Sequence, residues 1–305
     1  MDTHWLKLTG TKGAPRKRGR RRQNWLARLG QKLGLKRRRV AGRAVAKKAV
    51  ASRPATGLGF RVARLVNPIA LGAMALGLAS CSFFFDYEPP GPESFPIKGI
   101  DVSYYQEDID WQKVRRSNTS FAWIKVTEGG DWSDPKFEQN WYEAAAAGVA
   151  RGAYHFWYFC RPAQEQVSWF IEHVPYDPNA LPPVLDMEWT ASKTCPDRPS
   201  RATVLSEMKI WLDAIEAYYG KRPVIYTSVD FYRDRLRGAF PDYHMWVRSV
   251  RGHPMIRYGD LKWHFWQHTE DGRIAGIRGR VDRNVFYGTK GEWQEFLAGE
   301  LKPED

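Results

Sequence analysis

The chain has few cysteines and histidines, and its main apolar run is short. Only three cysteines and seven histidines occur in 305 residues, and no group of His, Cys and Asp has the spacing of a metal site. No glycine-rich loop of the phosphate-binding type is present. The apolar run from Pro68 to Ser80 falls short of the roughly 20 residues that a membrane-spanning helix needs. We therefore expect neither a metal nor a cofactor.

Acidic residues are almost absent from the first quarter of the chain. Between Met1 and Cys81 there are 20 Lys and Arg residues against one acid, Asp2, which leaves 27 basic and 33 acidic residues for the remainder. The net charge of +13 therefore comes from the N-terminal segment alone, and the rest of the chain is mildly acidic. This distribution argues against nucleic-acid binding by the part of the chain that follows Cys81.

The segment before Cys81 has the layout of an export signal. Arg61 and Arg64 precede the apolar run, which ends at Leu78-Ala79-Ser80-Cys81. This order of basic flank, apolar core, small residues and cysteine resembles the signal peptide and lipobox of bacterial lipoproteins. The resemblance implies cleavage before Cys81 and lipidation of its sulfur. The alternative is an ordinary signal anchor in which Cys81 is incidental.

We therefore divide the chain into four parts. Residues 1–61 are a basic segment unable to fold alone, residues 62–80 a lipoprotein signal peptide, residues 81–96 a lipidated Cys with a Pro-rich tether, and residues 97–298 the folded domain. Ser82 implies sorting to the periplasmic side of the outer membrane, with inner-membrane anchoring or secretion as alternatives. Residues 1–61 are either a misread upstream stretch or a cytoplasmic arm for nucleic acid or phospholipid.

The other two cysteines, Cys160 and Cys195, each follow an expected strand. In an oxidising compartment such a pair can form a disulfide. Two buried thiols are the alternative, and the sequence leaves both open.

From Ile97 onward, apolar runs of strand length alternate with helical patterns. We expect strands at residues 97–103, 121–126, 152–157, 184–188, 223–227, 245–248, 263–267 and 281–286. We expect helices at 109–116 (capped by Asp108), 137–147, 163–174, 200–219 and 231–236. Such alternation indicates a parallel sheet covered by helices, and eight strands in about 200 residues indicate a closed, TIM-barrel-like α/β fold that lacks helices in its last third.

Four acids lie in or next to these expected strands. Asp101, Asp186 and Glu188 lie near the ends of their strands, and Asp282 lies within the last one. Asp186 and Glu188 share one face of an extended strand, and repulsion between them raises one pKa. A protonated acid beside an ionised carboxylate is what glycosidic-bond cleavage needs, although a solvated Asp and Glu past a strand is the simpler interpretation. Asp101 and Asp282 also lie where barrel enzymes keep their chemistry, which favours a site.

The same stretches resemble glycoside hydrolase family 25, the lysozymes (N-acetylmuramidases) of the Chalaropsis type. The resemblance runs in order from about Lys98 to Gly288 and is carried by Gly99–Ser103 with Gln106, Ile124–Gly129, Asp134–Phe137 with Asn140, Gly152–Phe156, Pro183–Glu188, Ile225–Ser228, Trp266–Gln267 and Gly279–Asp282 with Asn284. It implies an irregular, flattened (β/α) barrel of five β/α units plus three further strands. It also implies hydrolysis of the β-1,4 bond from N-acetylmuramic acid to N-acetylglucosamine in peptidoglycan.

The resemblance also implies residue roles. Glu188 matches the family's general acid and Asp186 the carboxylate beside it, which either orients the substrate's acetamido group or acts directly as base or nucleophile. Asp101 and Asp282 match the two other acids of the cleft. Candidate substrate-binding residues are Tyr154, Tyr226, Glu128 and Trp266, with core packing as the alternative for both tyrosines and for Trp266.

Two departures from the family pattern leave the sugar preference open. Tyr104-Tyr105 stands where the family often has His-Trp, and Met245–Val250 where it often has Leu-Trp-x-Ala-x-Tyr. We expect a peptidoglycan hydrolase held at a membrane by its lipid anchor, with a non-catalytic peptidoglycan-binding or scaffolding lipoprotein as the alternative. The oligomeric state has no signal in the sequence.

Overall fold

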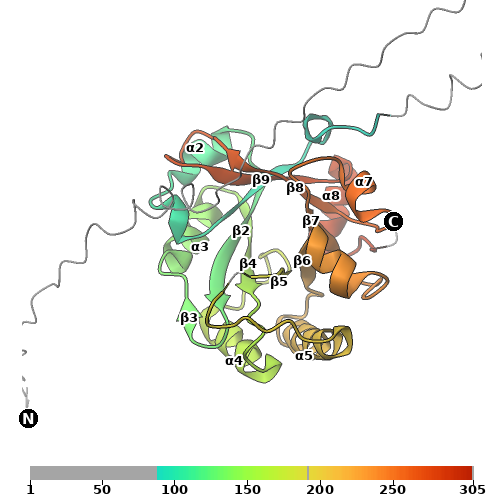
Figure 1. The fold of residues 1–305 in the computed structure, drawn as a ribbon. Helices are drawn as coiled ribbons and strands as arrows, with labels where there is room; N and C mark the ends of the chain where they lie inside the picture. The colour runs from blue at the N-terminus through green and yellow to red at the C-terminus, as the bar shows by residue number, and fades with distance from the viewer. Residues whose placement is uncertain (1–87, 191, 304–305) are drawn as a thin grey trace, which may run out of the picture. The chain divides into compact units, whose positions relative to one another are not determined.

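The computed structural model describes residues 88–190 and 192–303, shown in colour in Figure 1. The basic segment 1–61, the signal peptide 62–80, Cys81 and residues 82–87 of the tether lie outside the described residues. Within the described part, none of the helices combines the length and the apolar character needed to cross a membrane.

Eight strands close into a barrel (Figure 1). They are β1 (Lys98–Val102), β2 (Phe121–Glu128), β4 (Ala150–Phe156), β5 (Val184–Met187), β6 (Val224–Ser228), β7 (Met245–Arg248), β8 (Phe265–Gly272) and β9 (Val281–Phe286). Closure occurs because β1 pairs with both β2 and β9. A ninth strand, β3 (Trp132–Ser133), pairs with the end of β2 outside the ring. The predicted α/β barrel is confirmed.

The barrel is parallel except at β9, which runs antiparallel to both of its neighbours, β1 and β8. Only residues 273–280 join β8 to β9, and a parallel pairing needs a crossover of a dozen residues or more. The expected all-parallel sheet is therefore wrong at this one strand.

Helical segments follow each of the first five barrel strands along the chain, as predicted. They are α2 (Trp111–Arg116), α3 (Phe137–Ala146), α4 (Ala163–His173), α5 (Arg201–Tyr219), and α6 (Val229–Phe231) continuing into the π-helical turn η3 (Tyr232–Leu236). Short 3-10 turns form η1 (Pro92–Ser94) and η2 (Tyr104–Gln106). Two further helices, α7 (Pro254–Tyr258) and α8 (Lys290–Ala298), occupy the last third, where helices were not expected.

The cap of α2 differs from the prediction. Asp110, not Asp108, caps the helix, because its side chain accepts a hydrogen bond from the Lys113 amide. Asp108 instead forms an ion pair with Lys136, 2.5 Å from Nζ. The helix thus begins two residues later than the sequence pattern indicated.

Two apolar clusters stabilise the domain. Outward-facing strand residues pack under the helices, for example against Phe170 and Trp211. The inner cluster fills one end of the barrel with aromatic rings, namely Phe121, Trp123, Trp246, Phe265 and Phe286, and α8 adds Trp293 and Phe296. Gly99 allows this packing, because a Cβ there would lie 2.3 Å from the Phe121 ring.

Candidate active site

A cavity of about 370 Å³ opens at the carboxyl ends of the parallel strands. The barrel brings six of the predicted site residues to its lining. They come from β1, β4, β5, β6, β9 and, for Glu188, the position directly after β5: Asp101, Tyr154, Asp186, Glu188, Tyr226 and Asp282. Side chains on a strand alternate between its two faces, so Asp186 and Glu188 both point inward while Met187 is buried in the outer cluster. Acids that are up to 181 residues apart in the chain thus share one cavity.

Asp101 and Asp282 form a hydrogen-bonded pair. They face each other in the register of β1 and β9, and a hydrogen bond joins their side chains. Asp101 Oδ2 also accepts hydrogen bonds from Gln267 Nε2 at 3.0 Å and Asn284 Nδ2 at 2.8 Å. Burial and the Asp101 charge raise the pKa of Asp282 to about 9. At neutral pH the proton of this pair therefore lies on Asp282.

Asp186 and Glu188 form a second pair. Burial is the largest cause that raises the pKa of both carboxyls, and the charge of Glu188 raises the pKa of Asp186 well above its usual range. Arg248 opposes the rise for Glu188. Asp186 Oδ1 is buried and has no hydrogen-bond partner within the described residues. The pair therefore holds a proton more tightly than ordinary carboxyls do, and one acceptor atom of Asp186 is left without a partner among the described residues.

The two tyrosines that line the cavity keep their protons. Burial raises the pKa of Tyr154 and of Tyr226 well above the usual range, and the neighbouring carboxylates act in the same direction. The Tyr226 hydroxyl donates to Gln267 Oε1 at 2.9 Å. Both side chains can therefore donate hydrogen bonds to a bound molecule or to the site's own amides.

Two predicted binding residues lie elsewhere. Trp266 faces the outer cluster, where it is 5% exposed and its indole donates to the Ser249 carbonyl at 2.9 Å. The expectation that it shapes the cleft is wrong, because alternation along β8 turns Gln267, not Trp266, inward. Glu128 does not line this cavity; it lines a neighbouring one and pairs with Lys125 Nζ at 2.8 Å.

The prediction missed four polar residues that belong to the site: Lys125, Arg248, Gln267 and Asn284. The first three line the cavity, and Asn284 bridges Asp101 and the Trp246 indole, whose Nε1 donates at 2.8 Å. Three of them could have been found from the alternation of side chains along a strand. Every second residue shares a face, so Lys125 lies on the face of Phe121, Gln267 on that of Phe265, and Asn284 on that of Asp282.

A second cavity of about 630 Å³ adjoins the first, and both are lined by Tyr105 and Lys125. Cys160 lies in its wall and is joined to Cys195 by a disulfide. The bridge connects the loop after β4 to the loop after β5, which decides between the two alternatives left by the sequence. The cleft thus extends from the acids toward Trp132 and Arg161.

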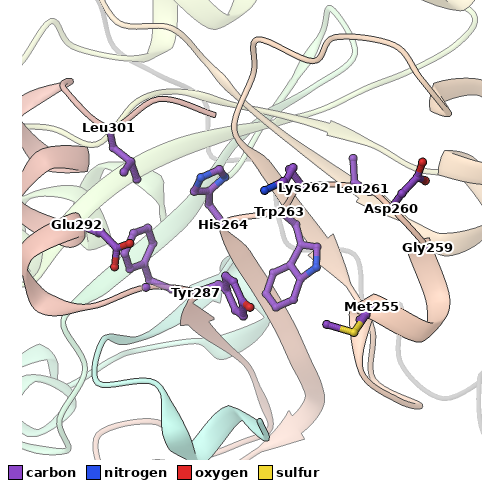
Figure 2. A pocket seen from close by; sticks show the side chains of 12 residues that line it. Met255, Gly259, Asp260, Leu261, Lys262, Trp263, His264, Tyr287, Glu292 and Leu301 are labelled. Carbon is purple, nitrogen blue, oxygen red and sulfur yellow. The ribbon is translucent and has the colours of Figure 1, made fainter. Parts of the chain in front are cut away.

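The opposite end of the barrel has a smaller cavity of about 260 Å³ (Figure 2). Its lining residues precede β8 or come from the end of β9 and beyond, and Figure 2 shows Trp263 beside Tyr287, with Met255 and Glu292 on opposite sides of them. None of the four acids borders it. Among residues 88–190 and 192–303, no group of three or more His, Cys, Asp or Glu side chains is placed to hold a metal ion.

An acidic cleft at the carboxyl end of a (β/α) barrel, with two carboxyl pairs whose pKa values are raised by burial, has the groups required for acid-catalysed cleavage of a glycosidic bond. Sequence comparison defines the class further. The chain belongs to the glycosyl hydrolases family 25, whose sequence profile matches residues 100–277. It is a glycoside hydrolase that acts as a muramidase.

Individual relatives agree with this membership. The chain is 37% identical over 227 residues to "Uncharacterized protein YegX" of Escherichia coli K12, covering 71% of this chain and 81% of the relative. It is 33% identical over 208 residues to "Lysozyme M1" of Streptomyces globisporus, covering 63% and 68%. A solved family 25 glycosyl hydrolase from Bacillus anthracis aligns with a TM-score of 0.63 at 36% identity, covering 69% of this chain and 97% of that one.

Proposed function

We propose that the enzyme hydrolyses the β-1,4 bond between N-acetylmuramic acid and N-acetylglucosamine in peptidoglycan, with Glu188 as the general acid and Asp186 assisting. The observation that carries this assignment is the convergence of four acids on one cavity, with raised pKa values caused mainly by burial. A carboxyl that is still protonated at neutral pH can donate to the leaving glycosidic oxygen.

Asp186 acts on the substrate's acetamido group. Its carboxylate lines the cavity and accepts the acetamido N–H, and this hydrogen bond favours the ionised form of Asp186. The proton of the pair then resides on Glu188. The acetamido oxygen attacks the anomeric carbon while the bond from that carbon to the leaving oxygen breaks. The leaving oxygen accepts the proton of Glu188. Glu188 next removes a proton from water, which attacks the anomeric carbon and restores the acetamido group.

Asp101 stabilises the positive charge that develops at the sugar. The amides of Gln267 and Asn284 and the proton of Asp282 all point at its carboxylate, and such donors hold the charged form in place. Asp282 serves as a positioning residue for Asp101, and Tyr226 positions Gln267 through its 2.9 Å hydrogen bond.

Replacement of Glu188 by Gln tests the assignment. We expect the release of reducing ends from purified peptidoglycan to fall by about 10²–10⁴-fold, with a melting temperature no lower than that of the wild type. Glu138→Gln on the exposed face of α3 is the matched control. Undiminished activity of Glu188→Gln would reject Glu188 as the acid. Wild-type protein that pellets with peptidoglycan and releases no reducing ends would support the binding-only alternative.

We further propose that the enzyme works as a lipoprotein on the periplasmic side of the outer membrane, anchored through Cys81. Support comes from the lipobox-like sequence and from the Cys160–Cys195 disulfide, since disulfides persist in oxidising compartments. Labelling with a radioactive fatty acid should mark the wild type and not Cys81→Ser. Membrane fractionation then separates outer-membrane from inner-membrane anchoring, and labelling of Cys81→Ser would contradict the anchor.

A further inference from the structure

Acidic groups outnumber basic groups in the lining of the cavity that holds the four acids. Five carboxyl groups border it, and of the described residues in its lining only two are cations, Lys125 and Arg248. The five carboxyls are Asp101, Asp186, Glu188, Glu270 and Asp282. Even with Asp282 protonated, four carboxyl groups face two cations, so the lining is dominated by acids. A negatively charged substrate would be repelled unless one of these cations received it.

Lys125 is enclosed by its own surroundings. Its side chain is only 11% exposed and its ammonium pairs with Glu128 at 2.8 Å. The same ammonium lies over the rings of Trp132 and Phe156, 4.9 and 4.6 Å from their centroids. These contacts give the Lys125 charge an ion pair and two aromatic faces in the wall between the two cavities.

Arg248 is placed differently. It is the last residue of β7, so its head lies at the mouth of the cavity, and its side chain is 34% exposed. Its Nη2 donates to Glu270, the one hydrogen-bond acceptor that the described residues give the guanidinium, and Glu188 and Tyr226 interact with its charge. The buried Tyr258 fixes its backbone by donating to the Arg248 carbonyl at 2.8 Å. The side chain is thus anchored at both ends, with nitrogen donors left for a ligand.

We propose that Arg248 is a specificity-determining residue that binds a carboxylate on the lactyl arm of the muramic acid unit. This inference rests on the proposed muramidase function. Muramic acid differs from glucosamine by a 3-O-lactyl group, which ends in a carboxylate in peptide-free glycan and otherwise bears a peptide with carboxylates of its own. A guanidinium presents several N–H groups in a planar fork that matches a carboxylate. Glu270 orients that fork and leaves its remaining donors open.

Kinetics on matched substrates test the proposal. Peptide-free glycan strands are compared with the same strands whose lactyl carboxylates have been converted to neutral amides, and peptide-bearing strands with amidated peptide-bearing strands. We expect Arg248→Met to raise the ratio of KM on carboxylate strands to KM on amidated strands about tenfold above the wild-type ratio, equal to about 1.4 kcal/mol. This ratio cancels any effect that the loss of Arg248 has on Glu188, because that effect is the same on both kinds of strand. Arg251→Met, which removes the same charge from an exposed turn outside the cavity, should behave as wild type.

The pattern of loss identifies the carboxylate. A KM effect on peptide-free strands assigns it to the lactyl group, and an effect restricted to peptide-bearing strands assigns it to the peptide; either result supports the proposal. Equal losses on charged and amidated strands, or a fall in kcat alone, would overturn it by showing that Arg248 acts on Glu188 or on the fold. Active Glu188→Gln enzyme would instead refute the proposed acid, so the two failures are distinguishable.

Discussion

The two ends of the barrel are built from the same eight strands, yet they have opposite chemistry. The end with the carboxyl termini of the parallel strands bears the acids, amides and tyrosines of the cleft. The other end is filled with rings and closed by Trp293 and Phe296 of α8. A packed end stabilises the fold and anchors the strands, so that the open end can hold buried charges that destabilise it.

Single strands show this gradient along their inward-facing residues. On β2 the sequence runs from Phe121 through Trp123 to Lys125. On β9, which runs the other way, it goes from Asp282 through Asn284 to Phe286. Polarity therefore follows the position along the barrel axis and not the direction of the chain.

The largest expected change in stability comes from the closed end. Phe121 is fully buried and its ring lies 5.4 to 5.6 Å from those of Trp123, Phe265 and Trp293. We expect Phe121→Ala to lower the free energy of unfolding by about 3–5 kcal/mol, measured by denaturant titration. Tyr105→Ala at the open end, where the side chain is 72% exposed, should change it by about 0.5 kcal/mol at most. Similar losses for both variants would contradict the division of roles.

A smaller loss of stability is expected when the disulfide between the loops of the open end is removed. Cys160→Ser/Cys195→Ser removes a bridge across 35 residues, which should lower the free energy of unfolding by about 2–4 kcal/mol. Activity at low temperature should persist, because neither cysteine borders the cavity that holds the four acids. Treatment of the wild type with a reductant should reproduce the loss. A double variant as stable as the oxidised wild type would show that the bridge contributes nothing.

Much of the barrel could be predicted because its signals are local. Apolar runs, the Ser200 cap and the Gly220 stop defined α5 to within one residue, and Asp-x-Glu on one strand face placed Asp186 and Glu188 together. The prediction of Trp266 as a site residue is wrong because side chains alternate along β8. Gln267, not Trp266, points into the barrel, and its role comes from a hydrogen bond to the distant Asp101.

The rest depends on strand register, which the sequence does not encode locally. Asp101 meets Gln267 and Asn284, 166 and 183 residues away, only after β1 closes the ring against β9. The Arg248–Glu270 pair likewise requires β7 and β8 to align. Helix α7, with five residues, is too short to show a helical period.

The smallest expected effect has the opposite sign, because it removes an acid whose ionisation favours the unfolded chain. The pKa of Asp282 is raised to about 9 in the folded chain, by burial and by Asp101, whereas in the unfolded chain it returns to the ordinary value of about 3.9. The folded state thus binds the proton more tightly. Stability from this group is full below pH 4 and is lost as the pH rises toward 9.

Asp282→Asn replaces the protonated carboxyl with a neutral amide that can still donate to Asp101. We expect the variant to exceed the wild type in unfolding free energy by at least about 1 kcal/mol at pH 8, with the difference closing below pH 4. Asp242→Asn, an exposed acid outside the cleft, should follow the wild type at every pH. Thermal melts between pH 3 and 9 measure this. Parallel curves for Asp282→Asn and the wild type would mean that Asp282 is already ionised in the folded protein, and that the open end holds its acids without a shared proton.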